Sequence, residues 1–225
     1  MPEEDHFKFN LELDFLELKA TKRNILSVAA RLFDPLGLLC PLVTKAKILL
    51  QELWIQKLDW DESIPLSLDT YWNKFKANLL KLSEISIPRF VFTYAYSSIQ
   101  IHGFAEASLR AYGCCIYERS VSPLGIKTTI STAILKVAPL KIKTLPRLEL
   151  CASHLLAKLW KVISPMLSQK LEKIVFWTDS EITLYWIKTH PSLLSVFVAN
   201  RVSGLVRICK LASCANQSDS CRYWI

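Results

Sequence analysis

The sequence predicts an α/β protein in which a helical N-terminal region is followed by a mixed β-sheet flanked by helices. Three observations lead to this prediction. Apolar residues recur at helical spacing as far as Pro88. After that proline they alternate with a period of two, as in strands with one buried face. A long helical stripe then precedes a continuous apolar run at 173–177, which is typical of a strand buried on both faces.

Composition is that of a folded domain. The chain has 225 residues, of which 51% are hydrophobic and 11% aromatic, so it can bury a core and a disordered chain is not expected. Its seven cysteines include no Cys-x-x-Cys pair, which favours free thiols over a zinc site. The acidic start 1–5 is no signal peptide, and the apolar stretch 36–43 is too short to span a membrane. We therefore expect a protein that is not secreted, with cytoplasm and nucleus both open.

The formal net charge is +8. Lysine and arginine side chains that neutralise phosphates release counterions, so an excess of them suits a nucleic-acid partner. An ordinary solubilising surface would give the same excess, and the charge alone does not decide between the two.

Residues 1–88 are expected to form a mostly helical region. Weak alternation from Phe7 to Leu13 suggests a strand or an extended lead-in. A first helix follows Thr21 and stops at 34–37, where Asp-Pro-Leu-Gly interrupts the pattern, and a second opens at Pro41. The apolar faces of the three predicted helices are Ile25, Val28, Ala29 and Leu32, then Ala46, Leu49, Leu50 and Leu53, then Leu68, Trp72, Phe75, Leu79 and Leu82.

Residues 89–202 are expected to form the sheet and its helices, in the order β-β-β-α-β-α. The first strand is expected from Phe90 through Phe92 and Tyr94 to Gly103, the second at 112–117 and the third at 127–135, as an antiparallel meander. A helix from Pro146 carries the stripe Leu148, Cys151, Leu155, Leu159 and Val162, and Ser180 is expected to cap a further helix. Residues 203–225 lose all periodicity, and we expect a poorly packed, divergent tail.

Three carboxylates occupy positions that favour a common site. Glu106 follows the first strand, Asp179 ends the buried strand, and Glu149 lies in the first turns of the long helix. Ligand sites in α/β sheets gather at the carboxyl ends of strands. Converging acids with hard oxygen donors suit Mg²⁺ or Mn²⁺, which can support phosphodiester hydrolysis. Taken singly, Glu149 could instead complement a helix dipole and Asp179 could assist a helix cap.

Several ordered motifs resemble one family, the BEL/Pao retrotransposon polyprotein. The resemblance covers about residues 21 to 201. The motifs are Thr21-Lys22-Arg23-Asn24-Ile25-Leu26-Ser27, Phe33-Asp34-Pro35-Leu36-Gly37-Leu38, Lys45-Ala46-Lys47, Trp60-Asp61, His102-Gly103-Phe104, Val137-Ala138-Pro139-Leu140-Lys141, Pro146-Arg147-Leu148-Glu149-Leu150 and Trp177-Thr178-Asp179-Ser180.

The resemblance implies a region that follows the reverse-transcriptase core and then a ribonuclease H-like (RNase H-like) domain. That domain would be a hydrolase that cuts the RNA strand of RNA–DNA hybrids with Mg²⁺ or Mn²⁺, using Glu106, Glu149 and Asp179 as catalytic and metal-binding residues. We expect nucleic acid to contact Lys141, Lys143, Arg147 and Ser180. The rest of the pol polyprotein is a further expected partner. No Tyr-x-Asp-Asp motif is present, so this part of the transposable element cannot synthesise DNA.

Two departures from the family pattern predict impaired activity. The family has Asp where this chain has Glu106, and the additional methylene displaces a ligand that must be held closely. The family's Asn-Pro-Ala-Asp segment is missing, which leaves the RNase H-like domain C-terminally incomplete, and Asp219 is the only carboxylate of the tail. The alternative is a non-catalytic remnant that still binds nucleic acid.

Families of this kind are often labelled Pao retrotransposon peptidase, so an aspartic peptidase is a third, less favoured hypothesis. A retroviral-type peptidase needs Asp-Thr-Gly or Asp-Ser-Gly. The nearest match, at 179–181, reads Asp-Ser-Glu and lacks the glycine.

Overall fold

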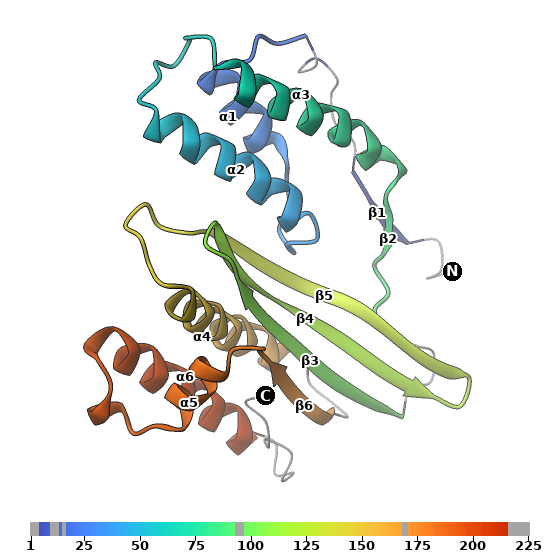
Figure 1. The fold of residues 1–225 in the computed structure, drawn as a ribbon. Coiled ribbons are helices and arrows are strands. Elements are labelled where there is room, and N and C mark those ends of the chain that lie inside the picture. Colours follow the sequence, from blue (N-terminus) through green and yellow to red (C-terminus); the bar gives the residue numbers. More distant parts are fainter. Residues whose placement is uncertain (1–4, 10–13, 15–16, 93–96, 168–170, 216–225) are drawn as a thin grey trace. The chain divides into compact units, whose positions relative to one another are not determined.

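The computed structural model describes residues 5–9, 14, 17–92, 97–167 and 171–215, with the backbone alone for 209–215. The chain divides into two compact units (Figure 1). The first comprises Met1–Pro35 and Leu39–Phe90, and the second comprises Leu36–Leu38 and Val91–Ile225. Helices dominate the first unit and a mixed sheet with helices forms the second, which confirms the predicted α/β class.

The first unit is built on three helices whose apolar faces meet in one core. They are α1 (Lys22–Arg31), α2 (Cys40–Ile55) and α3 (Leu66–Leu80), followed by a short 3₁₀ turn, η3 (Lys81–Glu84). The core contains the predicted residues Ile25, Val28, Leu32, Ala46, Leu49, Leu50, Leu53, Leu68, Trp72, Phe75, Leu79 and Leu82. Of the predicted faces, Ala29 alone is only partly buried.

This mostly helical region also contains a pair of short strands, of which the sequence suggested only the one near Phe7. Strand β1 (His6–Lys8) pairs antiparallel with β2 (Ser86–Pro88), and Phe7 lies opposite Ile87. The proline ends its strand, which is consistent with a residue that donates no ladder hydrogen bond. A strand of three residues gives at most a weak period-two pattern, and nothing local indicates which distant segment it will pair with.

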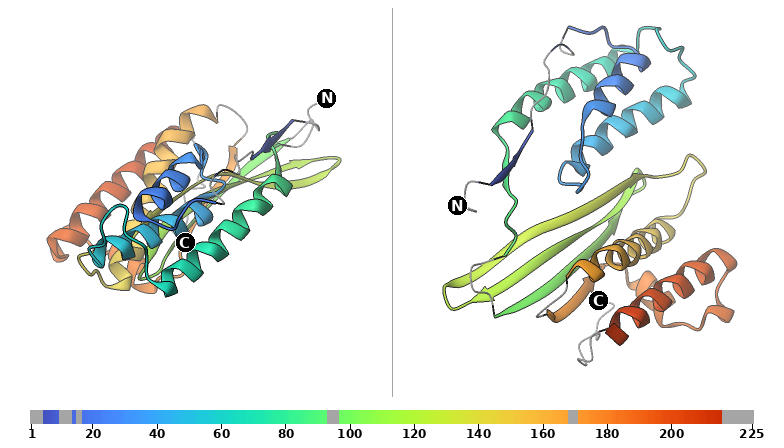
Figure 2. Two further views of the ribbon diagram at one scale, coloured as in Figure 1. Left: turned by 90° about the horizontal axis from the view of Figure 1, so that it is seen from above. Right: turned by 180° about the vertical axis from the view of Figure 1, so that it is seen from behind.

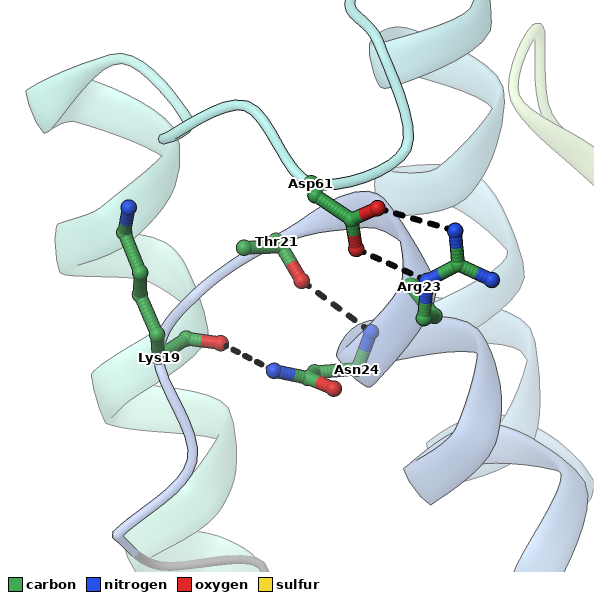
Figure 3. A network of polar contacts seen from close by, with 5 residues as sticks. All are labelled: Lys19, Thr21, Arg23, Asn24 and Asp61. Atoms are coloured by element: carbon green, nitrogen blue, oxygen red, sulfur yellow. Dashed lines mark hydrogen bonds and ion pairs between the residues drawn. The ribbon is translucent and has the colours of Figure 1, made fainter.

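The start of α1 is fixed by a network of polar contacts, which Figure 3 shows. The hydroxyl of Thr21 accepts a hydrogen bond from the backbone N–H of Asn24 and so caps the helix. Asn24 donates its side-chain amide to the carbonyl of Lys19 over 2.9 Å. Arg23 forms a two-pronged ion pair with Asp61, at 2.7 and 2.9 Å. The Thr-Lys-Arg-Asn motif is therefore a helix start that also holds the loop before α3.

Lys22 completes this anchor from the buried side. Its ammonium group donates to the carbonyl of Leu58 and lies 4.1 Å from the ring centroid of Trp54. Only 4% of the residue is exposed. A buried lysine is tolerated because a carbonyl and an aromatic face replace its water.

Within the second unit, four described strands form a mixed sheet in the order β5-β4-β3-β6. Strands β3 (Ser98–Ala107), β4 (Ala111–Ser122) and β5 (Gly125–Val137) make the predicted antiparallel meander, and β6 (Leu171–Trp177) runs parallel to β3. The first strand was predicted too early. It begins at Ser98, whereas Phe90 and Phe92 lie outside any strand and Tyr94 is outside the described residues.

Helix α4 (Leu145–Ile163) packs on β3 and β4 and covers one face of the sheet (Figures 1 and 2). On that helix the predicted stripe is buried at Leu148, Leu155 and Leu159 and half-buried at Cys151. Val162 is 64% exposed, and the next residue, Ile163, packs against the core in its place. Helices α5 (Glu181–Lys188) and α6 (Val196–Ala215) pack in turn on α4. The opposite face of the sheet carries no described helix of this unit (Figure 2).

The prediction that the chain is poorly packed from Ser203 onward was wrong for its first residues. Helix α6 continues to Ala215, with Val202 and Leu205 fully buried. Gly204 allows this packing, since a Cβ atom there would lie 3.0 Å from Nε2 of His154 on α4. Asp219 lies outside the described residues. Although α6 spans 20 residues, no described helix combines the length and apolar character needed to cross a membrane.

Gly103 marks the closest approach between the sheet and α4. A Cβ atom at this position would lie 2.5 Å from Cδ1 of Phe176 and 2.8 Å from Cδ1 of Leu156. The residue is buried between its neighbour strand β6 and the helix. The glycine of the His-Gly-Phe motif is therefore a packing requirement, because any side chain would separate the layers.

We expect Gly103→Ala to destabilise the second unit by about 1–3 kcal/mol through overpacking. Chemical denaturation followed by circular dichroism measures this change. If the clash with Phe176 is the cause, the double variant Gly103→Ala/Phe176→Leu should lose less than the sum of the single losses. Strict additivity would show that the two residues do not compete for space.

Candidate functional site

The strands β3 and β6 end at the same edge of the sheet because they are parallel. Glu106 is the penultimate residue of β3, and Asp179 follows two residues after the end of β6. The two carboxyl groups lie close enough for the charge of Asp179 to raise the pKa of Glu106.

Glu149 joins this pair from the first turns of α4. Its Oε2 accepts a hydrogen bond of 2.5 Å from the hydroxyl of Ser180, the residue next to Asp179. The same hydroxyl accepts from the backbone N–H of Thr183 and caps α5, as the sequence predicted. Three elements, β3, α4 and the β6–α5 turn, thus bring the three predicted acids into one neighbourhood.

The electrostatics of the cluster are those of crowded acids. Burial is the largest influence on Glu106 and raises the pKa of its carboxyl. The hydrogen bond of 2.8 Å from the backbone N–H of Ala107 opposes this rise, whereas the carboxylates of Asp179 and Glu149 add to it. A site of this kind gains stability from any cation or proton that reduces the repulsion.

The donor chemistry suits a hard divalent cation, but the arrangement does not. Among the described residues, no group of three or more His, Cys, Asp or Glu side chains is placed so that it could hold a metal ion. Glu106 accepts from the next N–H along the chain, and Glu149 is occupied by Ser180. The acids converge, yet as they stand they do not form a ready metal centre, so metal binding at these residues stays a prediction.

Beside α4, three cations gather around one aromatic ring, and we call Lys143, Arg147 and Arg201 the basic cluster. Their charged groups lie 4.5, 5.3 and 3.6 Å from the ring centroid of Phe197. Arg201 also donates to the carbonyl of Phe197, one turn earlier on α6. The sequence analysis predicted Lys143 and Arg147 but missed Arg201. The spacing of four residues between Phe197 and Arg201 could have indicated that the two lie on one face of a helix.

The two other residues predicted to contact nucleic acid differ in accessibility. Lys141 is exposed in the turn before α4. Ser180 is 6% exposed, and its hydroxyl is already engaged with Glu149. In the structure, Ser180 positions the acid cluster rather than presenting a free hydroxyl.

Sequence reasoning also missed a group of aromatic rings on the uncovered face of the sheet. Trp177 stacks on His102 and on Phe104, in each case at 6.3 Å between ring centroids and with planes 15° and 13° apart. Its indole N–H donates to Nδ1 of His102. We call these three residues the aromatic row. Trp177 was expected to be buried, but it is 42% exposed because β6 is an edge strand in the described sheet.

A mixed sheet in the order β-β-β-α-β-α, with acids at the ends of two parallel strands, defines an RNase H-like domain. The model of the family described as "Pao retrotransposon-like RNaseH-like domain" matches residues 21–180. The chain belongs to this family. The match confirms the resemblance noted in the motifs, and it stops at the cap of α5, before Arg201.

A solved structure supports the fold. The foamy viral protease-reverse transcriptase dRH in complex with double-stranded DNA is similar at a TM-score of 0.51 and 13% sequence identity. The similarity covers 90% of this chain and 33% of the viral one, so the chain spans about a third of that protein's length. A comparison with curated proteins found no match.

The crowding of acids predicts that Glu106→Gln stabilises the fold at neutral pH. The pKa of Glu106 is higher in the folded state than the ordinary glutamate pKa of 4.5, so the free energy of unfolding falls as the pH rises above 4.5. The uncharged amide of glutamine removes this loss of stability. The melting temperature of the variant should exceed that of the unmodified chain at pH 7, and the difference should shrink below about pH 4.5. Glu181→Gln, on the first turn of α5, is the control and should give no such gain. A lower melting temperature for Glu106→Gln at pH 7 would contradict the electrostatic argument.

Proposed function

We propose that this chain is a nucleic-acid-binding, RNase H-like part of a retroelement pol polyprotein in which hydrolysis of the RNA strand of RNA–DNA hybrids is impaired. The observation that carries the proposal is the acid cluster. Glu106, Glu149 and Asp179 converge where an RNase H-like site belongs, but the described residues form no group that could hold a metal.

The state of each acid supports impairment. In-line phosphodiester hydrolysis assisted by metal ions needs ligands that fix the cations together with the attacking and leaving oxygens. Glu106 is one methylene longer than the family's Asp and folds back onto the N–H of Ala107. Glu149 is hydrogen-bonded to Ser180. Each hydrogen bond engages one oxygen of its carboxylate and restricts how that carboxylate can turn toward a cation.

Binding has separate support. The basic cluster brings three cations together, and the chain has a net charge of +8. Phosphate contacts of this kind need no catalytic centre. The foamy viral protein of similar fold is in complex with double-stranded DNA, and we extend nucleic-acid binding from it to this chain as part of the proposal. The remainder of the polyprotein is the proposed partner of the first unit.

The geometry favours this proposal over an aspartic peptidase. The turn that holds Asp179 leads directly into α5, and Ser180 caps that helix. The Ser180 hydroxyl therefore caps the helix and donates to Glu149. In addition, Glu181 occupies the position at which the peptidase loop has glycine.

The basic cluster predicts the binding behaviour. The double variant Arg147→Ala/Arg201→Ala should bind an RNA–DNA hybrid more weakly, and the slope of log affinity against log salt should fall by about one for each phosphate that the protein no longer neutralises. Fluorescence anisotropy at several salt concentrations measures both effects. Lys74→Ala/Lys81→Ala, which removes two exposed lysines of the first unit, is the charge-matched control. Unchanged affinity and slope in the arginine variant would remove the basic cluster from the proposal.

Cleavage assays test impairment directly. With Mg²⁺ and a labelled hybrid, the unmodified chain should cleave slowly or not at all, and Glu106→Asp should restore activity only in part. Glu106→Asp combined with the family's missing C-terminal segment should restore far more. Robust Mg²⁺-dependent hydrolysis by the unmodified chain, abolished by Asp179→Asn, would contradict the proposed impairment.

A further inference from the structure

The uncovered face of the sheet carries side chains in ordered rows. Residues of β3 alternate, so that Ile99, Ile101 and Ala105 are buried toward α4 while His102 and Phe104 belong to the other face. The register places Phe104 beside Trp177 of β6, and His102 beside Tyr117 of β4. Along a strand, such rows repeat every two residues, about 6.6 Å.

The aromatic row presents ring surface to solvent. Phe104 and Trp177 are each 42% exposed, and Tyr117 meets the edge of Phe104 at 5.8 Å. The planes of His102 and Phe104 lie within 15° of that of Trp177, so the three rings share nearly one orientation. Fixed aromatic faces of this kind cost little entropy to use in stacking, because the rings are already ordered.

Two cations and one carboxylate border the row on one side, and the acid cluster borders it on the other. Lys173 and Arg119 both lie opposite Gln100, and Arg119 donates to the Gln100 amide oxygen over 2.9 Å. The Gln100 amide donates in turn to Glu172, whose carboxylate both cations attract. Both charges act on His102, whose pKa is lowered first by burial and then by Arg119 and Lys173. At neutral pH the imidazole is therefore uncharged and accepts from Trp177.

A cavity of about 320 Å³ lies on this face between the aromatic row and Glu106. Its lining is mostly apolar, with Phe104, Cys115 and Leu135, and the polar side chains in it are Glu106, Ser108 and Tyr112. The volume is at the lower end of that of small-molecule sites. A flat heterocycle with an apolar face and polar edges suits such a lining.

We propose that the uncovered face of the four-stranded sheet is a stacking platform for single-stranded nucleic acid, with bases on the aromatic row and phosphates toward Arg119 and Lys173. Aromatic rings interleaved with cations are the features that bind single strands without sequence preference. Two of the three charged groups of the border are cations, and the chain has a net charge of +8, which favours a polyanionic partner over a protein one.

The platform goes beyond the proposed function. It rests on that proposal in one respect, which is that the partner is nucleic acid. Its residues come from β3, β4 and β6, whereas the basic cluster comes from the β5–α4 connection, α4 and α6. The two surfaces therefore share no residue. A strand stacked on the row would end at the acid cluster, because Phe104 is two residues from Glu106 on the same face of β3.

The test compares two labelled 12-residue strands by fluorescence anisotropy at one salt concentration. One strand is oligodeoxythymidylate, and the other is an abasic strand with the same phosphates. Trp177→Ala and Phe104→Ala should each weaken binding of the thymidylate strand by about five- to a hundredfold, with little change for the abasic strand. Trp177→Phe keeps a ring and should retain most of the binding. Tyr185→Ala removes an aromatic residue of α5 that is 68% exposed and serves as the control.

Phe104→Leu separates loss of stacking from loss of folding, because leucine keeps apolar volume but removes the ring. This variant should bind the thymidylate strand more weakly, with an unchanged melting temperature. Unchanged thymidylate binding in the alanine variants would overturn the platform, as would an equal loss for the abasic strand. A change in self-association without a change in binding would assign the face to a protein interface instead. Hybrid binding by Arg147→Ala/Arg201→Ala separates the two proposals, because its result does not depend on the aromatic row.

Discussion

The parallel pairing of β3 with β6 is the constraint on which the rest of the second unit depends. It brings two strand ends to one edge and so places Glu106 beside Asp179. Because Gly103 has no side chain, the side chains of Phe176 and Leu156 pack directly over β3 at this point. The acid cluster follows from the strand pairing, and the glycine lets α4 pack closely on it.

The acid cluster shows how a fold can keep the geometry of a site without keeping its chemistry. The repulsion among the acids is balanced by hydrogen bonds within the protein, from the Ala107 N–H to Glu106 and from the Ser180 hydroxyl to Glu149. Each of these bonds replaces some of the stabilisation that a cation would supply in a working site. Binding of nucleic acid depends on other residues, so it can persist when cleavage is absent.

The asymmetry of the sheet has consequences of its own. Helices α4, α5 and α6 lie on one side of the sheet (Figure 2). The second face carries partly exposed rings such as Phe104 and Trp177, each 42% exposed. Trp177 is the last residue of β6, whereas Ile174, Val175 and Phe176 before it are buried. An edge strand at the end of its ladder has neighbours on only one side.

The sequence by itself determined the class of the fold, the order of its elements and the three acids, because helix and strand periods and strand-end positions are local properties of the chain. It also determined the family, through motifs such as the Thr-Lys-Arg-Asn start of α1. Only the tertiary structure decided the β1–β2 pair, the burial of Leu205, the gathering of Arg201 around Phe197 and the alignment of the aromatic row. Each of these joins or orients residues through packing between elements, and a one-dimensional pattern carries no information about which distant segments will meet.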